Sequence, residues 1–89
     1  MADPKVISFI ARSKRRLEVL NLLKEHELSQ VKLTKLTKMY KGHTSRTLKE
    51  LSDKKLIACK NQEDRTFRFY KITTLGRRIL EEAQKLINT

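Results

Sequence analysis

Apolar residues recur at helical spacing over most of the chain. The widest apolar stripe predicts a helix from residue 14 to about residue 26, with Ser13 as its cap. After a break in the pattern, a shorter helix is expected from Ser29 or Gln30 to about residue 38. Two helices therefore follow each other closely in the first half of the chain.

A third helix is predicted from about Lys41 to Lys54. In this segment Thr44, Leu48 and Leu51 fall at positions i, i+4 and i+7. Side chains at that spacing share one face of a helix, so we expect this face to be buried.

Both ends of the chain are also expected to be helical. Asp3 and Pro4 are the residue types that cap and open a helix, and a short apolar stretch follows them. Thr73 or Thr74 is expected to cap a last helix that runs through about Ile87.

Between the third and the last helix the pattern becomes strand-like. Residues 56–59 predict one short strand and residues 66–72 a second, since both runs are rich in apolar, β-branched or aromatic residues. The polar residues 61–64 between them predict a turn, so the segment is interpreted as a β-hairpin. The predicted fold class is mainly α with a small β-hairpin (α+β), in the order helix, helix, helix, hairpin, helix.

The length of 89 residues predicts a single domain, with a core from about residue 13 to residue 73. A chain this short buries a modest core, and dimerisation would add to its stability. Its single cysteine, Cys59, cannot form an intramolecular disulfide, which fits a reducing compartment. The sequence also has no apolar run of about 18 residues and no secretory signal pattern, so we expect a cytoplasmic protein.

The net charge of the chain is its strongest indication of function. The chain has 21 Lys and Arg against 10 Asp and Glu, a formal net charge of +11. Such an excess repels itself in a compact state and usually has a polyanionic partner. Nucleic acid is the first candidate and an anionic membrane surface the second, while a merely soluble basic surface is the alternative without a partner.

The basic residues gather around the second and third predicted helices. Residues 29–49 include no acidic side chain and six basic ones: Lys32, Lys35, Lys38, Lys41, Arg46 and Lys49. On a helical wheel, Gly42, Arg46 and Lys49 lie opposite the apolar face of the third helix, flanked by His43 and Ser45. A small residue and hydrogen-bonding cations on one face suit a helix that enters the DNA major groove.

Each of these residues also has a structural interpretation. Arg46 could pair with Glu50 at i+4 instead of contacting DNA, and His43 could cap local backbone. Gly42 could be a weak helix start. Lys41 and Lys49 suit phosphates better than base edges, because a flexible point charge does not fix the geometry of a base contact.

The hairpin and the start of the main helix add further cations. Arg65 and Arg68 follow the predicted turn, where Arg65 could enter a minor groove or instead pair with a nearby acid. The basic run of Arg12, Lys14, Arg15 and Arg16 opens the main helix, where cations oppose the helix dipole. A nearby polyanion would relieve this repulsion, so these residues could contact backbone phosphates. Strand alternation is expected to turn Tyr70 and Ile72 inward, although the hairpin aromatics could also form a stacking platform for a single strand.

Residues 13–80 resemble the winged helix-turn-helix regulators, especially small archaeal members of the broad group that includes MarR- and ArsR-type proteins. The segments that carry the resemblance are RSKRRLEVLNLL at 12–23, YKGHTSRTLKEL at 40–51, KKLI at 54–57, EDRTFRFYKIT at 63–73 and TLGRRIL at 74–80. The stretch from residue 13 to residue 80 covers about three-quarters of the chain. Their order is specific for the fold and less specific for function.

The resemblance implies a recognition helix from about Tyr40, a hairpin wing, and dimerisation through the terminal segments 1–12 and 74–89. Carried over by position, the DNA-binding residues are Lys41, Gly42, His43, Ser45, Arg46, Arg65 and Arg68, to which the wheel adds Lys49. The sequence departs from the family pattern at Lys38 and Lys55, where glycine is frequent, and in a wing without glycine, so those turns could differ in shape.

The predicted function is a sequence-specific regulator of transcription that binds double-stranded DNA as a homodimer. A winged-helix protein-interaction module, a non-specific architectural DNA binder and an RNA binder are the alternatives. The sequence has no Walker loop, HExxH motif or Gly-rich dinucleotide fingerprint, so we do not expect an enzyme. It gives no indication of a cofactor, a metal site or a small-molecule effector.

Overall fold

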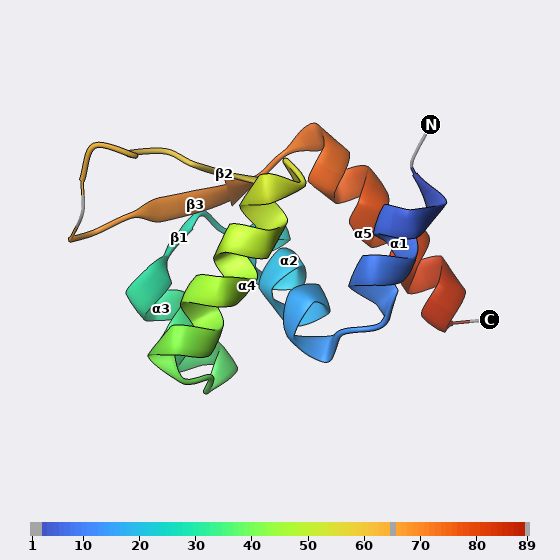
Figure 1. Cartoon of the computed structure of the whole chain (residues 1–89), viewed down its shortest axis with the longest axis horizontal. Coiled ribbons are helices and arrows are strands. Elements are labelled where there is room, and N and C mark those ends of the chain that lie inside the picture. The colour runs from blue at the N-terminus through green and yellow to red at the C-terminus, as the bar shows by residue number, and fades with distance from the viewer. Residues whose placement is uncertain (1–2, 65, 89) are drawn as a thin grey trace.

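The computed structural model describes residues 3–64 and 66–88, which form five helices and a small sheet (Figure 1). The winged helix-turn-helix fold expected from the sequence is confirmed. The short helix expected after Asp3 precedes the three helices of the predicted order, and one short strand is additional. In chain order the elements are α1 (Pro4–Ala11), α2 (Lys14–Glu25), β1 (Leu28–Ser29), α3 (Gln30–Thr37), α4 (Lys41–Asp53), β2 (Ile57–Cys59), β3 (Phe69–Ile72) and α5 (Thr74–Ile87).

Four of the five helices begin at a side chain that accepts a hydrogen bond from the first turn. The Asp3 carboxylate accepts from the amide of Lys5, and the hydroxyls of Ser13, Ser29 and Thr73 each accept from an amide three residues on. Such caps satisfy amides that have no partner inside the helix. Only α4 lacks a side-chain cap, since Tyr40 precedes it.

The sheet is antiparallel and has the order β1-β3-β2, with β3 in the centre. Tyr70 pairs with Leu28 of β1 on one side and with Cys59 of β2 on the other. The break expected at Leu28 is therefore a short edge strand, which the sequence analysis missed. A strand of two residues is too short for an alternating pattern to be detectable.

The hairpin strands are shorter than predicted. β3 begins at Phe69 rather than at residue 66, because the side chains of Asn61 and Asp64 hold residues 66–69 in a turn. Leu56 precedes β2 and is fully buried at the end of α4. The predicted inward positions of β3, Tyr70 and Ile72, are confirmed as buried.

The core lies between α2, α4, α5 and the sheet. Leu20, Leu48, Leu51 and Leu80 are almost completely buried in it. Figure 1 shows α1 lying against α5, and its Ile10 is fully buried in the same core. The two segments expected to form a dimer thus already pack on each other within one chain.

α5 can pack closely because its first turn holds a glycine. A Cβ atom on Gly76 would lie 2.1 Å from the carbonyl oxygen of Leu56, which is backbone and cannot move aside. The same carbonyl accepts hydrogen bonds from the amide and the hydroxyl of Thr73, at 3.0 Å each. This contact fixes the last helix against the end of α4.

Two lysines occupy left-handed backbone conformations where glycine was expected. Lys38 ends α3 with φ 58°, and Lys55 follows α4 with φ 60°. After α4 the amide of Lys55 donates to the Ser52 carbonyl and that of Leu56 to the Leu51 carbonyl, which is a Schellman motif with lysine in the position that favours glycine. These turns therefore keep the shape that glycine would adopt.

Candidate nucleic-acid interface

The outer face of α4 carries the residues that the helical wheel assigned to it. Lys41, Gly42, Ser45, Arg46 and Lys49 are all exposed. The opposite face is buried through the expected Thr44, Leu48 and Leu51, and Thr47 joins them at 5% exposure. Thr47 was not predicted, because it lies at i+3 from Thr44 and the predicted face followed only the positions i, i+4 and i+7.

His43 differs from the other predicted contact residues in being half-buried. Its ring meets the ring of Tyr40 edge to face, with the centroids 5.8 Å apart. Tyr40 is 80% exposed, so this pair stands at the solvent-facing start of α4. The expected capping by His43 is not among the hydrogen bonds of residues 3–64 and 66–88.

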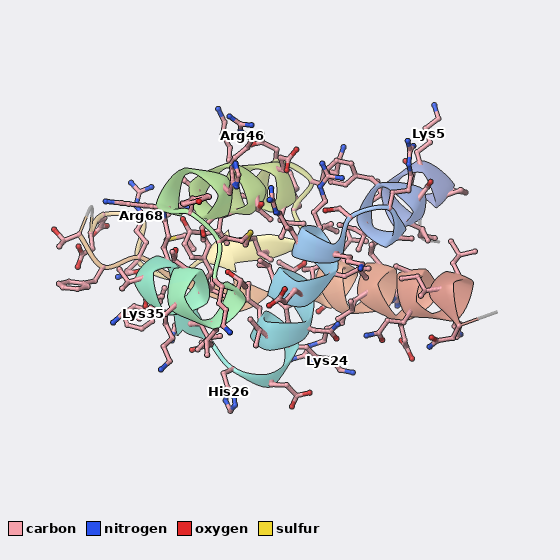
Figure 2. The ribbon with its side chains drawn as sticks, turned by 90° about the horizontal axis from the view of Figure 1, so that it is seen from below. Lys5, Lys24, His26, Lys35, Arg46 and Arg68 are labelled. Atoms are coloured by element: carbon pink, nitrogen blue, oxygen red, sulfur yellow. The ribbon has the colours of Figure 1, made fainter. Side chains whose placement is uncertain are left out.

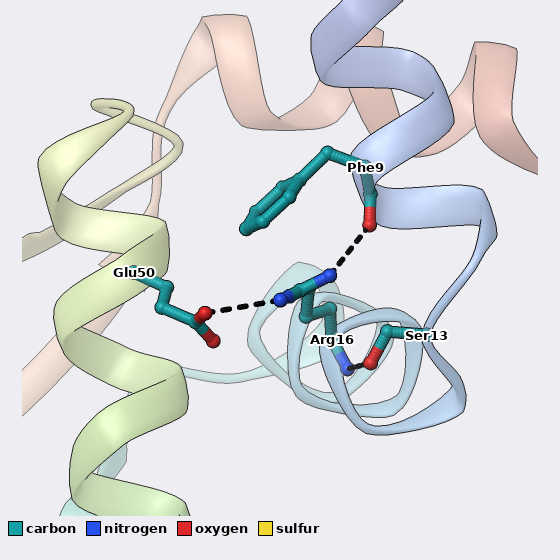
Figure 3. A network of polar contacts seen from close by, with 4 residues as sticks. All are labelled: Phe9, Ser13, Arg16 and Glu50. Atoms are coloured by element: carbon teal, nitrogen blue, oxygen red, sulfur yellow. Dashed lines mark hydrogen bonds and ion pairs between the residues drawn. The ribbon is translucent and has the colours of Figure 1, made fainter.

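The carboxylate that could have neutralised Arg46 is occupied by another residue. Glu50 forms an ion pair with Arg16 of α2, with 3.0 Å between Oε2 and the guanidinium (Figure 3). No hydrogen bond or ion pair joins the Arg46 side chain to any residue that the structure describes. The intrahelical interpretation of Arg46 is therefore wrong, and its guanidinium faces solvent.

Arg16 itself has a structural role rather than the phosphate contact considered for the run of Arg12, Lys14, Arg15 and Arg16. Besides Glu50, its guanidinium donates to the Phe9 carbonyl at 2.9 Å and lies 3.5 Å from the centre of the Phe9 ring. It thereby joins α1, α2 and α4 (Figure 3). The neighbouring Lys14 and Arg15 are exposed and stay available to a ligand.

The wing is shaped by two polar side chains instead of a glycine. Asn61 accepts a hydrogen bond from the Phe69 amide at 2.8 Å and donates one to the Phe67 carbonyl. The Asp64 carboxylate accepts from the amides of Phe67 and Thr66, and these bonds hold the pKa of Asp64 below its usual value of 3.8. The wing is thus ordered by side-chain to backbone bonds.

Of the two predicted wing arginines, Arg65 lies outside the described residues. Arg68 is exposed, and its Nε donates to the carbonyl of Asp64 at 3.1 Å. In Figure 2, Arg46 and Arg68 lie on the same side of the molecule, while Lys24 and His26 lie on the opposite side. The structure therefore brings the wing arginine and the α4 arginine to one surface.

Two hollows lie along α4, and another, between α3 and the wing, includes Lys41 and Arg68. On the α2 side, a cleft of about 270 Å³ includes Arg15, His43 and Arg46, and also the carboxylate of Glu50. On the hairpin side, an open groove of about 650 Å³ is lined by α4 and the strands. The side chains of that groove are Gln30, Ser45, Lys49, Ser52, Lys55, Ile57, Ala58, Cys59, Gln62, Arg68, Tyr70 and Thr73.

The larger groove brings together residues that the sequence analysis had kept apart. It contains the predicted Ser45, Lys49 and Arg68, and adds Lys55, which was noted only as a departure from glycine. Its charged side chains are all cationic. The only sequence signal for Lys55 was its charge, which did not distinguish it from other surface lysines.

Known proteins share this fold. The profile of a family described as "HVO_A0261 N-terminal domain" matches residues 4–89. The transcriptional regulator BldR from Sulfolobus solfataricus superposes with a TM-score of 0.76 at 23% identity, covering 85% of this chain and 55% of that one. YusO from Bacillus subtilis gives 0.73 at 25% identity, with 82% and 53% covered.

MepR from S. aureus, in a complex with DNA, superposes with a TM-score of 0.72 at 22% identity, covering 85% of this chain and 64% of that one. The present chain thus spans little more than half of the solved chains that it resembles. These likenesses confirm the predicted fold, that of the MarR-like winged helix-turn-helix proteins. No curated protein matches the sequence.

None of the helices that the structure describes is long and apolar enough to cross a membrane. The described residues also bring together no group of three or more side chains that could hold a metal ion.

Proposed function

The chain belongs to the family of the HVO_A0261 N-terminal domain, and we propose that it is a regulator of transcription. In this role it would bind specific sites in double-stranded DNA. In this proposal α4 enters the major groove and the hairpin lies near the adjacent minor groove. Lys41, Gly42, His43, Ser45 and Arg46 face the base edges or the phosphates beside them, Lys49 contacts phosphate, and Arg65 and Arg68 act from the wing.

The observation that carries the proposal is the outer face of α4. Its Arg46 is exposed and has no acidic partner among the described residues, because Glu50 is engaged by Arg16. An arginine that is free to use both of its terminal nitrogens can bind the O6 and N7 atoms of guanine together. The glycine one turn before it leaves room for close approach, since nothing lies within 4 Å of where its Cβ would be.

We further propose that two copies act together as a homodimer. The support is a set of exposed apolar side chains on α5, which include Leu75 at 41% and Ile87 at 52% exposure. A two-fold dimer would place two copies of α4 about one helical turn apart on DNA, so its binding site would be a pseudo-palindrome.

The test is selection from a pool of random-sequence duplexes, followed by sequencing of the retained DNA and by anisotropy titrations over a series of salt concentrations. A two-fold symmetric motif supports a dimeric, site-specific regulator. Tight binding without a motif, with a steep salt dependence, would instead identify an architectural DNA binder. No binding at low salt would exclude the DNA proposal and favour a protein-interaction module.

A further inference from the structure

We infer that the groove between α4 and the hairpin holds the sugar-phosphate backbone of one DNA strand, and that Lys55, which lies outside the recognition helix, contacts a phosphate there. The inference rests on the proposed function and adds to it a binding residue and a path for one strand. Lys55 follows the end of α4 and lines the groove together with Lys49 and Arg68.

The chemistry of the groove fits a phosphodiester chain. Three cations line it, and so do Ser45 and Ser52, two residues with a hydroxyl that are exposed at least in part. Cations and hydroxyls are the side-chain groups that most often contact phosphate oxygens in protein–DNA complexes. None of the described lining residues is acidic, whereas the cleft on the α2 side of α4 contains Glu50.

The position of the groove beside α4 also fits the path of one DNA strand. A helix in the major groove lies between the two phosphate backbones, so a strand must pass along each side of it. The hairpin-side groove follows α4 from Ser45 through Lys49 and Ser52 to Lys55. Arg46 and Arg68 lie on the same side of the molecule (Figure 2), so a duplex seated on α4 brings one strand over this groove.

The backbone of Lys55 gives a second, independent observation. Its φ of 60° is the conformation that favours glycine, and that conformation is fixed from both sides. The Lys55 amide donates to the Ser52 carbonyl at 2.9 Å, and its carbonyl accepts from the Thr73 hydroxyl at 2.8 Å. The backbone from which the Lys55 side chain enters the groove is therefore held in one conformation.

Lys38 supplies a matched control within the same chain. It is also a lysine with positive φ at the end of a helix, and it is also exposed, but it lines neither of the two hollows beside α4. Replacing either lysine by glycine removes one charge and relieves the same backbone strain. The two substitutions thus make the same chemical change, one in the lining of the groove and one away from it.

The experiment compares Lys55→Gly, Lys38→Gly and Lys55→Gln with the wild type, using thermal unfolding and anisotropy titrations of a random-sequence duplex over a salt series. We expect both glycine variants to unfold at a higher temperature. Lys55→Gly should bind DNA about tenfold more weakly at 0.1 M salt, with the slope of log K against log salt reduced by about 1. Lys55→Gln should show the same loss of binding without the gain in stability.

Equal binding losses for Lys55→Gly and Lys38→Gly would overturn the inference, because they would reduce the role of Lys55 to overall charge. Unchanged binding of Lys55→Gln would overturn it as well. If the wild type itself binds no duplex at low salt, the proposed function fails together with the inference. Binding by the wild type that Lys55→Gly leaves intact excludes the inference alone.

Discussion

The carboxylate of Glu50 lies 3.0 Å from the guanidinium of Arg16, and this ion pair decides which cation of α4 is left without an acidic neighbour. Glu50 and Arg46 are one helical turn apart, at a spacing where they could have paired. Arg16 reaches Glu50 from another helix and is itself held by the Phe9 carbonyl. Glu50 therefore pairs with Arg16 of α2 and not with Arg46 of its own helix. The same contact thus stabilises the fold and frees Arg46.

Replacing Glu50 by alanine should lower the free energy of unfolding by about 1 kcal/mol, because the pair is half-buried and Arg16 would lose a charged hydrogen-bond partner. DNA affinity should not fall, since the change removes a negative charge near the interface. Chemical denaturation and anisotropy titrations measure the two quantities. Glu82→Ala is the control, because it breaks an exposed pair with Lys85 and should change stability by less than about 0.5 kcal/mol.

Arg46→Ala should leave the unfolding midpoint nearly unchanged, because the side chain is exposed and has no partner among the described residues. Binding to the selected DNA site should weaken by about 1–3 kcal/mol if Arg46 contacts a guanine, and specificity should relax at one base pair. Titrations against every single-base variant of the site measure this. A loss that is equal for all sequences would make Arg46 a phosphate contact, and Lys24→Ala on the opposite face should change little.

The features of this fold that could be predicted from the sequence are those that depend on residues close together in the chain. The buried face of α4 and four helix caps were predictable, because they depend on residues within one or two turns. The partner of Glu50 was not, since Arg16 lies 34 residues away and the nearer Arg46 was the natural expectation. The hydrogen bond from the Thr73 hydroxyl to the Lys55 carbonyl was equally unpredictable, because the two residues lie 18 positions apart.

The two glycines of the chain should respond to alanine in opposite ways. Gly76→Ala should destabilise the fold by about 3 kcal/mol, because the new methyl group would overlap the Leu56 carbonyl. Gly42→Ala should instead stabilise it by about 0.5 kcal/mol, since a Cβ there meets nothing within 4 Å and alanine favours the helix. Thermal and chemical denaturation of both variants measure the difference.

The Gly42→Ala variant also tests the orientation of α4 on DNA. If Gly42 faces the duplex, the added methyl group should weaken binding by about tenfold, or about 1.4 kcal/mol, even though the fold becomes more stable. Ser45→Ala is a suitable comparison on the same face, because it removes a hydroxyl without adding bulk. Unchanged affinity of Gly42→Ala would mean that the start of α4 does not approach the DNA closely.

The wing should lose its order at low pH. The amides of Phe67 and Thr66 donate to the Asp64 carboxylate and lower its pKa from the usual 3.8, so these bonds stabilise the turn at any pH above that value. The stabilisation should disappear as the pH falls below 3.8 and through the lowered pKa. The ¹⁵N–¹H chemical shifts of residues 66 and 67, followed between pH 7 and pH 2, measure the transition directly.

Asp64→Asn separates the charge from the hydrogen bonds, because an amide oxygen can still accept from the same two backbone groups but does not titrate over this range. In that variant the shifts of residues 66 and 67 should stay near their neutral-pH values throughout the acid titration, whereas Asp64→Ala should already show the low-pH shifts at pH 7. If the wild-type shifts titrate with a pKa at or above 3.8, the carboxylate does not hold the turn. Asn61, which bonds both Phe67 and Phe69, would then be the residue that shapes the wing.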